Sequence, residues 1–217
     1  MHRHLHICRD AIMRILVGLA LGFMLTSAAY ADRTDEAAKM IETLVAEIQD
    51  IAATVTIGDN IYKQSDDIID RYFKYETLAS FTIGPYWRKA SDAQRQRYLK
   101  TFRAVVVEQA ANNFDYFRSL EYHFQSSEKK GENWIIVNGI VHDKTGKYPD
   151  AAISWRINDM PGQDLYIYDL SFENVSMILT QKDENMAVLR QNKGNLDALI
   201  DLLAKRSEEL RQARLRN

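Results

Sequence analysis

At 217 residues, the chain fits one domain and is long enough to bury a substantial core. Its 46% hydrophobic and 27% charged residues are ordinary for a soluble globular protein. The formal net charge of −2 lacks the basic excess typical of nucleic-acid-binding proteins and argues against that class.

Residues 1–31 have the pattern of a secretory signal peptide. Three arginines precede or begin an apolar run, Ile15 to Leu25, which is followed by an A-x-A site that ends at Ala31. We expect cleavage there, which leaves residues 32–217 as a single mature domain in the periplasm. A retained anchor is the alternative, but the run is shorter than the roughly 20 residues that a membrane helix needs. Met13 is an alternative start codon.

Cys8 is the only cysteine, and it precedes the apolar run. It therefore cannot be a lipoprotein cysteine, and it is lost with the signal peptide. The mature chain has no disulfide, so its stability must come from its core.

The first half of the mature chain has helical patterns. Apolar residues at helical spacing predict three helices, over residues 34–53, 62–75 and 77–81. The clearest helix begins at Ser91, which forms a capping box with Gln94, and we expect it to continue to about Phe117.

From Leu120 the apolar period changes to two, which is typical of half-buried strands. Four strands are predicted, in the stretches that begin at Leu120, Trp134, Ile153 and Asp164. Their short connections favour an antiparallel meander with helices packed on one face, an α+β fold. Two helices follow, over residues 181–191 and from Leu196, and we expect the charged end, residues 205–216, to be frayed or solvated.

Few residues of the mature chain suggest catalysis or metal binding. Its two histidines, His123 and His142, have no cysteine or second histidine at ligand spacing, so no metal site is predicted. No nucleophile elbow, Walker A loop or dinucleotide fingerprint is present. Asp169, in an apolar strand, could act as a general base, as in cone-shaped α+β enzymes. Alternatively, it pairs with an arginine or caps a strand-end amide, and the absence of nearby oxyanion donors favours a protein that is not an enzyme.

Three stretches resemble the MlaC family, also called toluene-tolerance proteins, which includes the hopanoid-associated HpnM branch. Residues 83–91, IGPYWRKAS, with Gln94-Arg95, resemble its LG-x-x-W-R-x-A-(ST)-x-x-Q-R segment. Residues 168–177, YDLSFENVSM, resemble its YD-(VI)-x-(VI)-E-G-(VI)-S segment, and the stretch Gly194 to Ile200 resembles its C-terminal G-x-x-x-L-I-x-x-L. Asn174 replaces the usual glycine, and asparagine also tolerates a left-handed turn. Gln181-Lys182 stands where a Tyr-Arg-like pair is common.

The resemblance implies a cone-shaped fold, similar to nuclear transport factor, in which a curved four-stranded sheet and the terminal helices enclose an apolar cavity. It also implies a periplasmic carrier, without a cofactor, that takes phospholipid as cargo. Such carriers shuttle lipid between an inner-membrane ABC transporter with its substrate-binding ring and an outer-membrane lipoprotein complex. A hopanoid-type cargo, an enzyme that uses Asp169, and an adaptor with a filled core remain the alternatives.

Apolar faces of the predicted helices and strands are the candidate walls of such a cavity, although some of these residues must be plain core. The candidate lipid-binding residues are Phe73, Leu78, Phe81, Trp87, Tyr98, Phe102, Val105, Val106, Trp134, Ile136, Ile153, Trp155, Ile167 and Val175. Burial of about 0.8 kcal/mol per CH₂ would hold an acyl chain without a charged trap for the headgroup.

Overall fold

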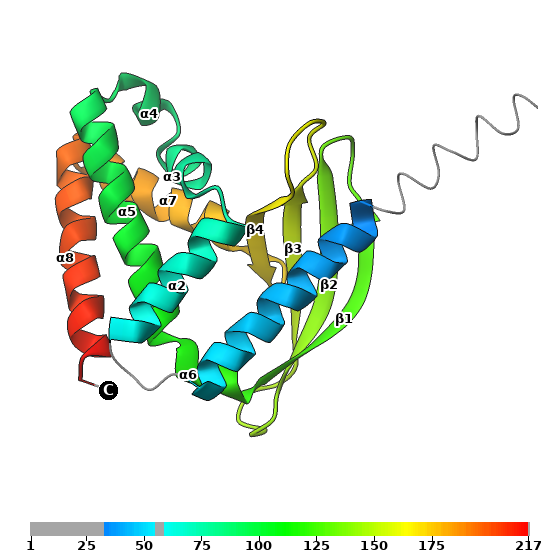
Figure 1. The fold of residues 1–217 in the computed structure, drawn as a ribbon. Coiled ribbons are helices and arrows are strands. Elements are labelled where there is room, and N and C mark those ends of the chain that lie inside the picture. Colours follow the sequence, from blue (N-terminus) through cyan, green and yellow to red (C-terminus); the bar gives the residue numbers. More distant parts are fainter. Residues whose placement is uncertain (1–32, 55–58, 217) are drawn as a thin grey trace, which may run out of the picture.

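The structure, a computed structural model, describes residues 33–54 and 59–216 (Figure 1). The predicted signal peptide, its cleavage site after Ala31 and the alternative start at Met13 lie outside the described residues. Over residues 33–54 and 59–216, no helix is both long enough and apolar enough to cross a membrane.

The described chain forms two parts, a sheet crossed by one helix and a layer of further helices (Figure 1). The crossing helix comprises residues 33–54 and is drawn in blue. The other helices are α2 (Asp59–Tyr72), α3 (Tyr75–Ile83), α4 (Pro85–Lys89), α5 (Asp92–Asn112), α6 (Phe114–Ser119), α7 (Met177–Gln191) and α8 (Leu196–Arg214). The predicted α+β class is confirmed.

The sheet is an antiparallel meander of five strands in the order β1-β2-β3-β4-β5. Its strands are β1 (Leu120–Lys129), β2 (Trp134–Asp143), β3 (Ala151–Asn158), β4 (Tyr166–Phe172) and β5 (Val175–Ser176). The first four were predicted. The fifth was not, because two residues are too few to show an alternating pattern, and it pairs only with the end of β4.

One face of the sheet, which we call the inner face, packs against helix 33–54. Along β2, Ile135, Val137 and Val141 are buried and alternate with half-buried residues, as the pleat requires. They belong to a first core cluster that also includes Ile41 and Leu44 of the crossing helix. The inner face and this helix therefore enclose one hydrophobic core.

A second core cluster lies within the helical layer, among α3, α5, α7 and α8. The predicted capping box at the start of α5 is confirmed, since the Ser91 hydroxyl accepts from Gln94 N at 3.2 Å and Gln94 Oε1 accepts from Ser91 N at 3.1 Å. The helix ends at Asn112 rather than near Phe117. Asn113, whose side-chain amide donates to a carbonyl of the preceding turn, interrupts it, and α6 then turns buried Phe114 into the first cluster.

Other helix ends also differ from the predicted ones. The helix predicted over 62–75 ends at Tyr72, because Phe73 leaves it to form a bridge with Ile167 of β4. The helix predicted from Gln181 begins four residues earlier, at Met177, where the Ser176 hydroxyl accepts from a first-turn amide.

The charged C-terminal end was predicted to be frayed or solvated; it does not fray, but most of its residues are exposed. Helix α8 continues to Arg214, which is only 4% exposed. Its Nε donates to Glu108 Oε2 at 2.8 Å, and Glu108 is 3% exposed. This ion pair joins the end of α8 to α5, so the last helix is docked against the helical layer.

Candidate functional site

Two aromatic residues, Tyr122 and Trp155, lie on the inner face, and Tyr122 rests on a glycine. Tyr122 of β1 lies opposite Val141 of β2, and Trp155 of β3 lies opposite Val137, so both rings are on the inner face. A Cβ built on Gly139 would lie 2.3 Å from the Tyr122 ring, so the ring rests directly on this glycine. Gly139 therefore lets Tyr122 lie flat along the sheet.

The Tyr122 hydroxyl and the Trp155 indole nitrogen of this aromatic pair are buried close to each other. Neither the Tyr122 hydroxyl nor the Trp155 indole nitrogen has a partner of normal geometry in the described part of the chain. Burial raises the pKa of Tyr122 to about 12, the Glu42 carboxylate adds to the rise, and the nearby Trp155 N–H opposes it. The phenol is thus neutral at physiological pH. An unmatched hydroxyl and N–H in an apolar setting suit a ligand that is largely apolar but carries oxygen acceptors.

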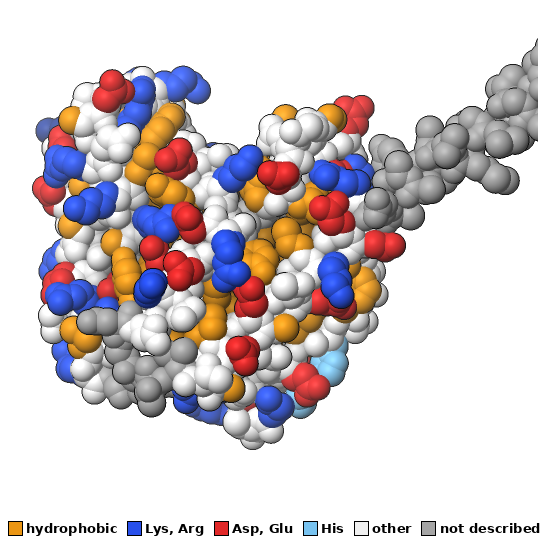
Figure 2. Space-filling model, in the orientation of Figure 1, with side chains coloured by type: hydrophobic (Ala, Val, Ile, Leu, Met, Phe, Trp, Pro, Cys, Tyr) orange, Lys and Arg blue, Asp and Glu red, His pale blue; other side chains and the backbone are white. Residues whose placement is uncertain are grey.

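A seam between helix 33–54 and α2 leads toward the inner face. Figure 2 shows hydrophobic side chains along this seam, between the charged outer faces of the two helices. Glu47 of the crossing helix spans it, accepting from Arg71 Nη1 at 2.8 Å and from the Tyr72 hydroxyl at 3.1 Å. Partly buried Val45 and Phe73 pack against the first cluster. These two hydrogen bonds join helix 33–54 to the end of α2 across the seam.

The structure divides the 14 candidate lining residues into three groups. Those in the first cluster, by the inner face, are Phe73, Ile153, Trp155 and Ile167. Those in the second cluster, inside the helical layer, are Trp87, Tyr98, Phe102, Val105 and Val106. Those in neither cluster are Leu78, Phe81, Trp134, Ile136 and Val175.

Tyr98 and Val175 have surroundings that differ from those of the inner-face residues. Tyr98 is fully buried, and its hydroxyl forms hydrogen bonds with Thr82 at 2.7 Å and with Asn185 at 3.1 Å, so its polar atom is already satisfied by other helices. Burial raises its pKa. Val175, in β5, is 57% exposed.

A pocket of about 370 Å³ lies where α3, α4, β4 and α7 meet. It is lined by Thr77, Ser80, Phe81, Gly84, Trp87, Arg88, Tyr168 and Lys182. Tyr168 joins it to two other aromatic rings, with centroid distances of 5.8 Å to Phe81 and 4.9 Å to Trp134. Two of the candidate residues, Phe81 and Trp87, thus line this pocket, and a third, Trp134, packs against its Tyr168.

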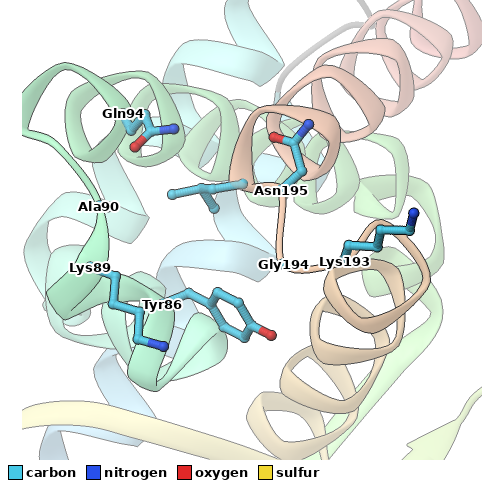
Figure 3. Close-up of a pocket in the computed structure, with 8 residues that line it drawn as sticks. Tyr86, Lys89, Ala90, Gln94, Lys193, Gly194 and Asn195 are labelled. Carbon is cyan, nitrogen blue, oxygen red and sulfur yellow. The ribbon is translucent and has the colours of Figure 1, made fainter.

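A second pocket, of about 390 Å³, lies in the helical layer (Figure 3). Figure 3 shows Tyr86 and Lys89 of α4 on one side and Lys193, Gly194 and Asn195 of the α7–α8 turn on the other. A Cβ built on Gly194 would lie 2.9 Å from the Tyr86 ring, so the glycine allows the ring to approach the turn.

Asp169, the candidate general base, has its carboxylate engaged by the chain itself. It is 4% exposed, and it accepts from Leu170 N at 2.9 Å, Ser176 Oγ at 2.6 Å and Ile178 N at 3.1 Å. These contacts fix the β4–β5 turn, where Asn174 has the expected left-handed φ of 64°. They support an ordering role for Asp169 rather than a catalytic one.

His123 and His142 lie at the surface. His142 Nδ1 is 2.6 Å from the Asp150 carboxylate at the mouth of the β2–β3 hairpin, and this hydrogen bond raises the pKa of His142. Among the described residues, no three His, Cys, Asp or Glu side chains come together in a group that could hold a metal ion.

Comparison with known proteins assigns the family. The family model for the MlaC protein matches residues 38–205, which is most of the chain. The chain belongs to the MlaC family. The resemblance in the three sequence stretches is therefore confirmed.

Two relatives show how far this likeness extends. The chain is 24% identical over 131 residues to the intermembrane phospholipid transport system binding protein MlaC of Haemophilus influenzae, a match that covers 59% of this chain and 60% of that protein. The chain thus spans about three fifths of that relative's length. A phospholipid-binding protein from Ralstonia solanacearum, solved in complex with a phospholipid, superposes with a TM-score of 0.66 over 80% of this chain and 97% of that one. At 14% identity, this second likeness shows a shared fold.

Tyr122 and Gly139 were absent from the sequence-based candidates. A lone glycine inside the apolar strand Trp134–Val141 is a signal for close approach of another group to the backbone, and it could have identified the ring that rests there.

Proposed function

We propose that this protein binds a phospholipid and carries it through the periplasm. The observation that carries the proposal is the inner face, where an apolar cluster under helix 33–54 contains the unmatched polar atoms of Tyr122 and Trp155. Membership of the MlaC family supports it, as do the phospholipid named for the Haemophilus influenzae relative and the one bound by the Ralstonia solanacearum protein.

The acyl chain supplies most of the binding free energy. At about 0.8 kcal/mol per buried CH₂, a chain of roughly fifteen methylenes gains on the order of 12 kcal/mol before ordering costs. An ester or phosphate oxygen would give the Trp155 N–H and the Tyr122 hydroxyl a partner. A phospholipid therefore fits better than a hopanoid-type lipid, because fused hydrocarbon rings offer no acceptor along their length.

The lining residues of this site are those of the first cluster. We place the acyl chain against Phe73, Ile153, Trp155, Ile167 and Tyr122, and it reaches them through the seam spanned by Glu47. The second-cluster candidates other than Trp87 hold the helical layer together instead. The loaded protein exchanges its lipid with an inner-membrane ABC transporter and its substrate-binding ring on one side and an outer-membrane lipoprotein complex on the other.

Transfer between vesicles tests the carrier function. Donor vesicles contain a self-quenched fluorescent phospholipid, acceptors contain none, and fluorescence rises as lipid moves. We expect the mature chain to speed transfer well above the rate for vesicles alone. Trp155→Phe, which keeps an aromatic ring but removes the donor, slows it several-fold, whereas Tyr148→Phe on the exposed hairpin does not. A parent protein that leaves the rate at that of vesicles alone would refute the proposal.

A further inference from the structure

The pocket at the junction of α3, α4, β4 and α7 is unusual in its charge. It is lined by three aromatic rings, Phe81, Trp87 and Tyr168, and by two cations, Arg88 and Lys182, and no acidic residue lines it. Neither cation has a carboxylate within ion-pair distance in residues 33–54 and 59–216. Within these residues, the pocket therefore carries two positive charges without an ion-pair partner.

Two of the aromatic rings already hold a cation of the protein. The Lys182 ammonium lies 4.1 Å from the centroid of the Phe81 ring, and the Arg95 guanidinium lies 5.5 Å from that of Trp87. A ligand ammonium would meet these cations and be repelled, although aromatic pockets otherwise attract such groups. An anionic oxygen would be attracted by Lys182 and Arg88, and the apolar walls weaken the competition from water.

The pocket is close to the proposed acyl-chain site. Ile167 is fully buried in the first cluster, and Tyr168, the next residue of β4, lines the pocket. The register between β3 and β4 shifts between Arg156 and Ile157, which pair with Asp169 and Ile167. Tyr168 is therefore the extra residue of a bulge in β4. Because successive strand residues point to opposite faces of a sheet, the inner face and the pocket lie on the two sides of β4, whose outer edge pairs, among the described residues, only with the short β5 and with Phe73.

We propose that this pocket binds the phosphate of the lipid headgroup and makes the protein select anionic phospholipids over those that also carry an ammonium group. The inference rests on the proposed function and adds a preference among phospholipids to it. Lys182 and Arg88 contact the phosphate, while Lys182 and Arg95 exclude a headgroup cation.

Competitive loading tests this preference. The delipidated mature chain is incubated with mixed vesicles of equal phosphatidylglycerol and phosphatidylcholine of the same acyl composition, and the bound lipid is identified by mass spectrometry. We expect phosphatidylglycerol to exceed phosphatidylcholine by about tenfold, the effect of one charge-assisted contact. The variant Lys182→Gln/Arg88→Gln brings the ratio close to one, and Lys182→Arg retains it.

A matched variant controls for general attraction to an anionic membrane. Lys89→Gln/Lys193→Gln removes the same number of charges from the pocket in Figure 3, and it should keep the parent ratio. Titration with inorganic phosphate should give no heat, because the headgroup arrives with its chain.

Each outcome has a separate meaning. An equal ratio for the parent, an unchanged ratio for the Lys182/Arg88 variant, or an equal fall in the control overturns this inference while leaving lipid binding intact. Binding of free phosphate at micromolar affinity overturns it as well, in favour of a small-anion site. No uptake of either lipid overturns the proposed function itself.

Discussion

Removal of the Asp169 side chain should destabilise the protein strongly. The carboxylate satisfies two backbone amides and one hydroxyl, and it lies at the start of α7, where the helix dipole favours a negative charge. In Asp169→Ala these donors lose their partner. At about 1–3 kcal/mol for each buried donor left unmatched, and with partial relaxation of the turn, we expect a loss of about 3 kcal/mol in the free energy of unfolding.

Asp169→Asn should be milder, at about 1 kcal/mol. Its amide oxygen can still accept from Leu170 N and Ile178 N, which share Oδ1 in the parent, and its NH₂ can donate to Ser176 Oγ. Urea unfolding measures both variants. The corresponding fall in melting temperature for Asp169→Ala is roughly 6–12 °C for a domain of this size.

Asp183→Ala is the matched control, since Asp183 is an exposed acid on the same helix, and it should change stability by less than about 0.5 kcal/mol. Lipid retention should fall together with stability in Asp169→Ala. If Asp169→Ala is as stable as the parent, the turn does not depend on this carboxylate and the reasoning is wrong.

Three further perturbations test other contacts. Arg214→Met leaves Glu108 buried without its partner and should cost about 3 kcal/mol, measured by urea unfolding. Glu47→Gln weakens the contacts across the seam and should speed release of bound lipid several-fold with little change in stability, measured as transfer to acceptor vesicles. Burial alone would raise the pKa of Asp143, but hydrogen bonds from its hairpin loop lower it from 3.8 to about 2, so its stabilisation is present above pH 4 and is lost as the pH falls toward 2. Asp143→Asn should flatten the pH dependence of stability over that range.

Each of these three predictions has its own contradicting result. Wild-type stability in Arg214→Met would mean that α8 does not need its buried anchor. Release from Glu47→Gln at the parent rate would place the route for the lipid elsewhere than the seam. An unchanged slope of stability against pH in Asp143→Asn would show that its loop contributes nothing to the folded state in acid.

Local patterns predicted much of the fold. The capping box at Ser91 and the period of two from Leu120 depend on residues near one another in the chain, and both are confirmed. The end of α5 at Asn112 could not be predicted in this way, because the apolar pattern continues into α6 while the axis changes direction to reach the sheet. The pairing of Arg214 with Glu108 joins residues 106 positions apart, and a charged sequence does not reveal such a partner.

The candidate site was harder to predict than the fold. An apolar face shows that a residue is buried but not in which of two clusters, so Trp155 and Tyr98 looked equivalent although they pack in different cores. One of the alternatives for Asp169, that it caps a backbone amide, agrees with the structure, and it could be predicted because its partners in the turn are close in sequence. The aromatic ring on Gly139 depends on the register between β1 and β2, which sequence spacing alone does not give.

Native mass spectrometry of the protein purified from cells tests lipid binding most directly. We predict a major species whose mass equals the mature chain plus one phospholipid, and release of that phospholipid on collisional activation. A protein that carries no lipid, and still takes none after incubation with phospholipid vesicles, would contradict the proposed function.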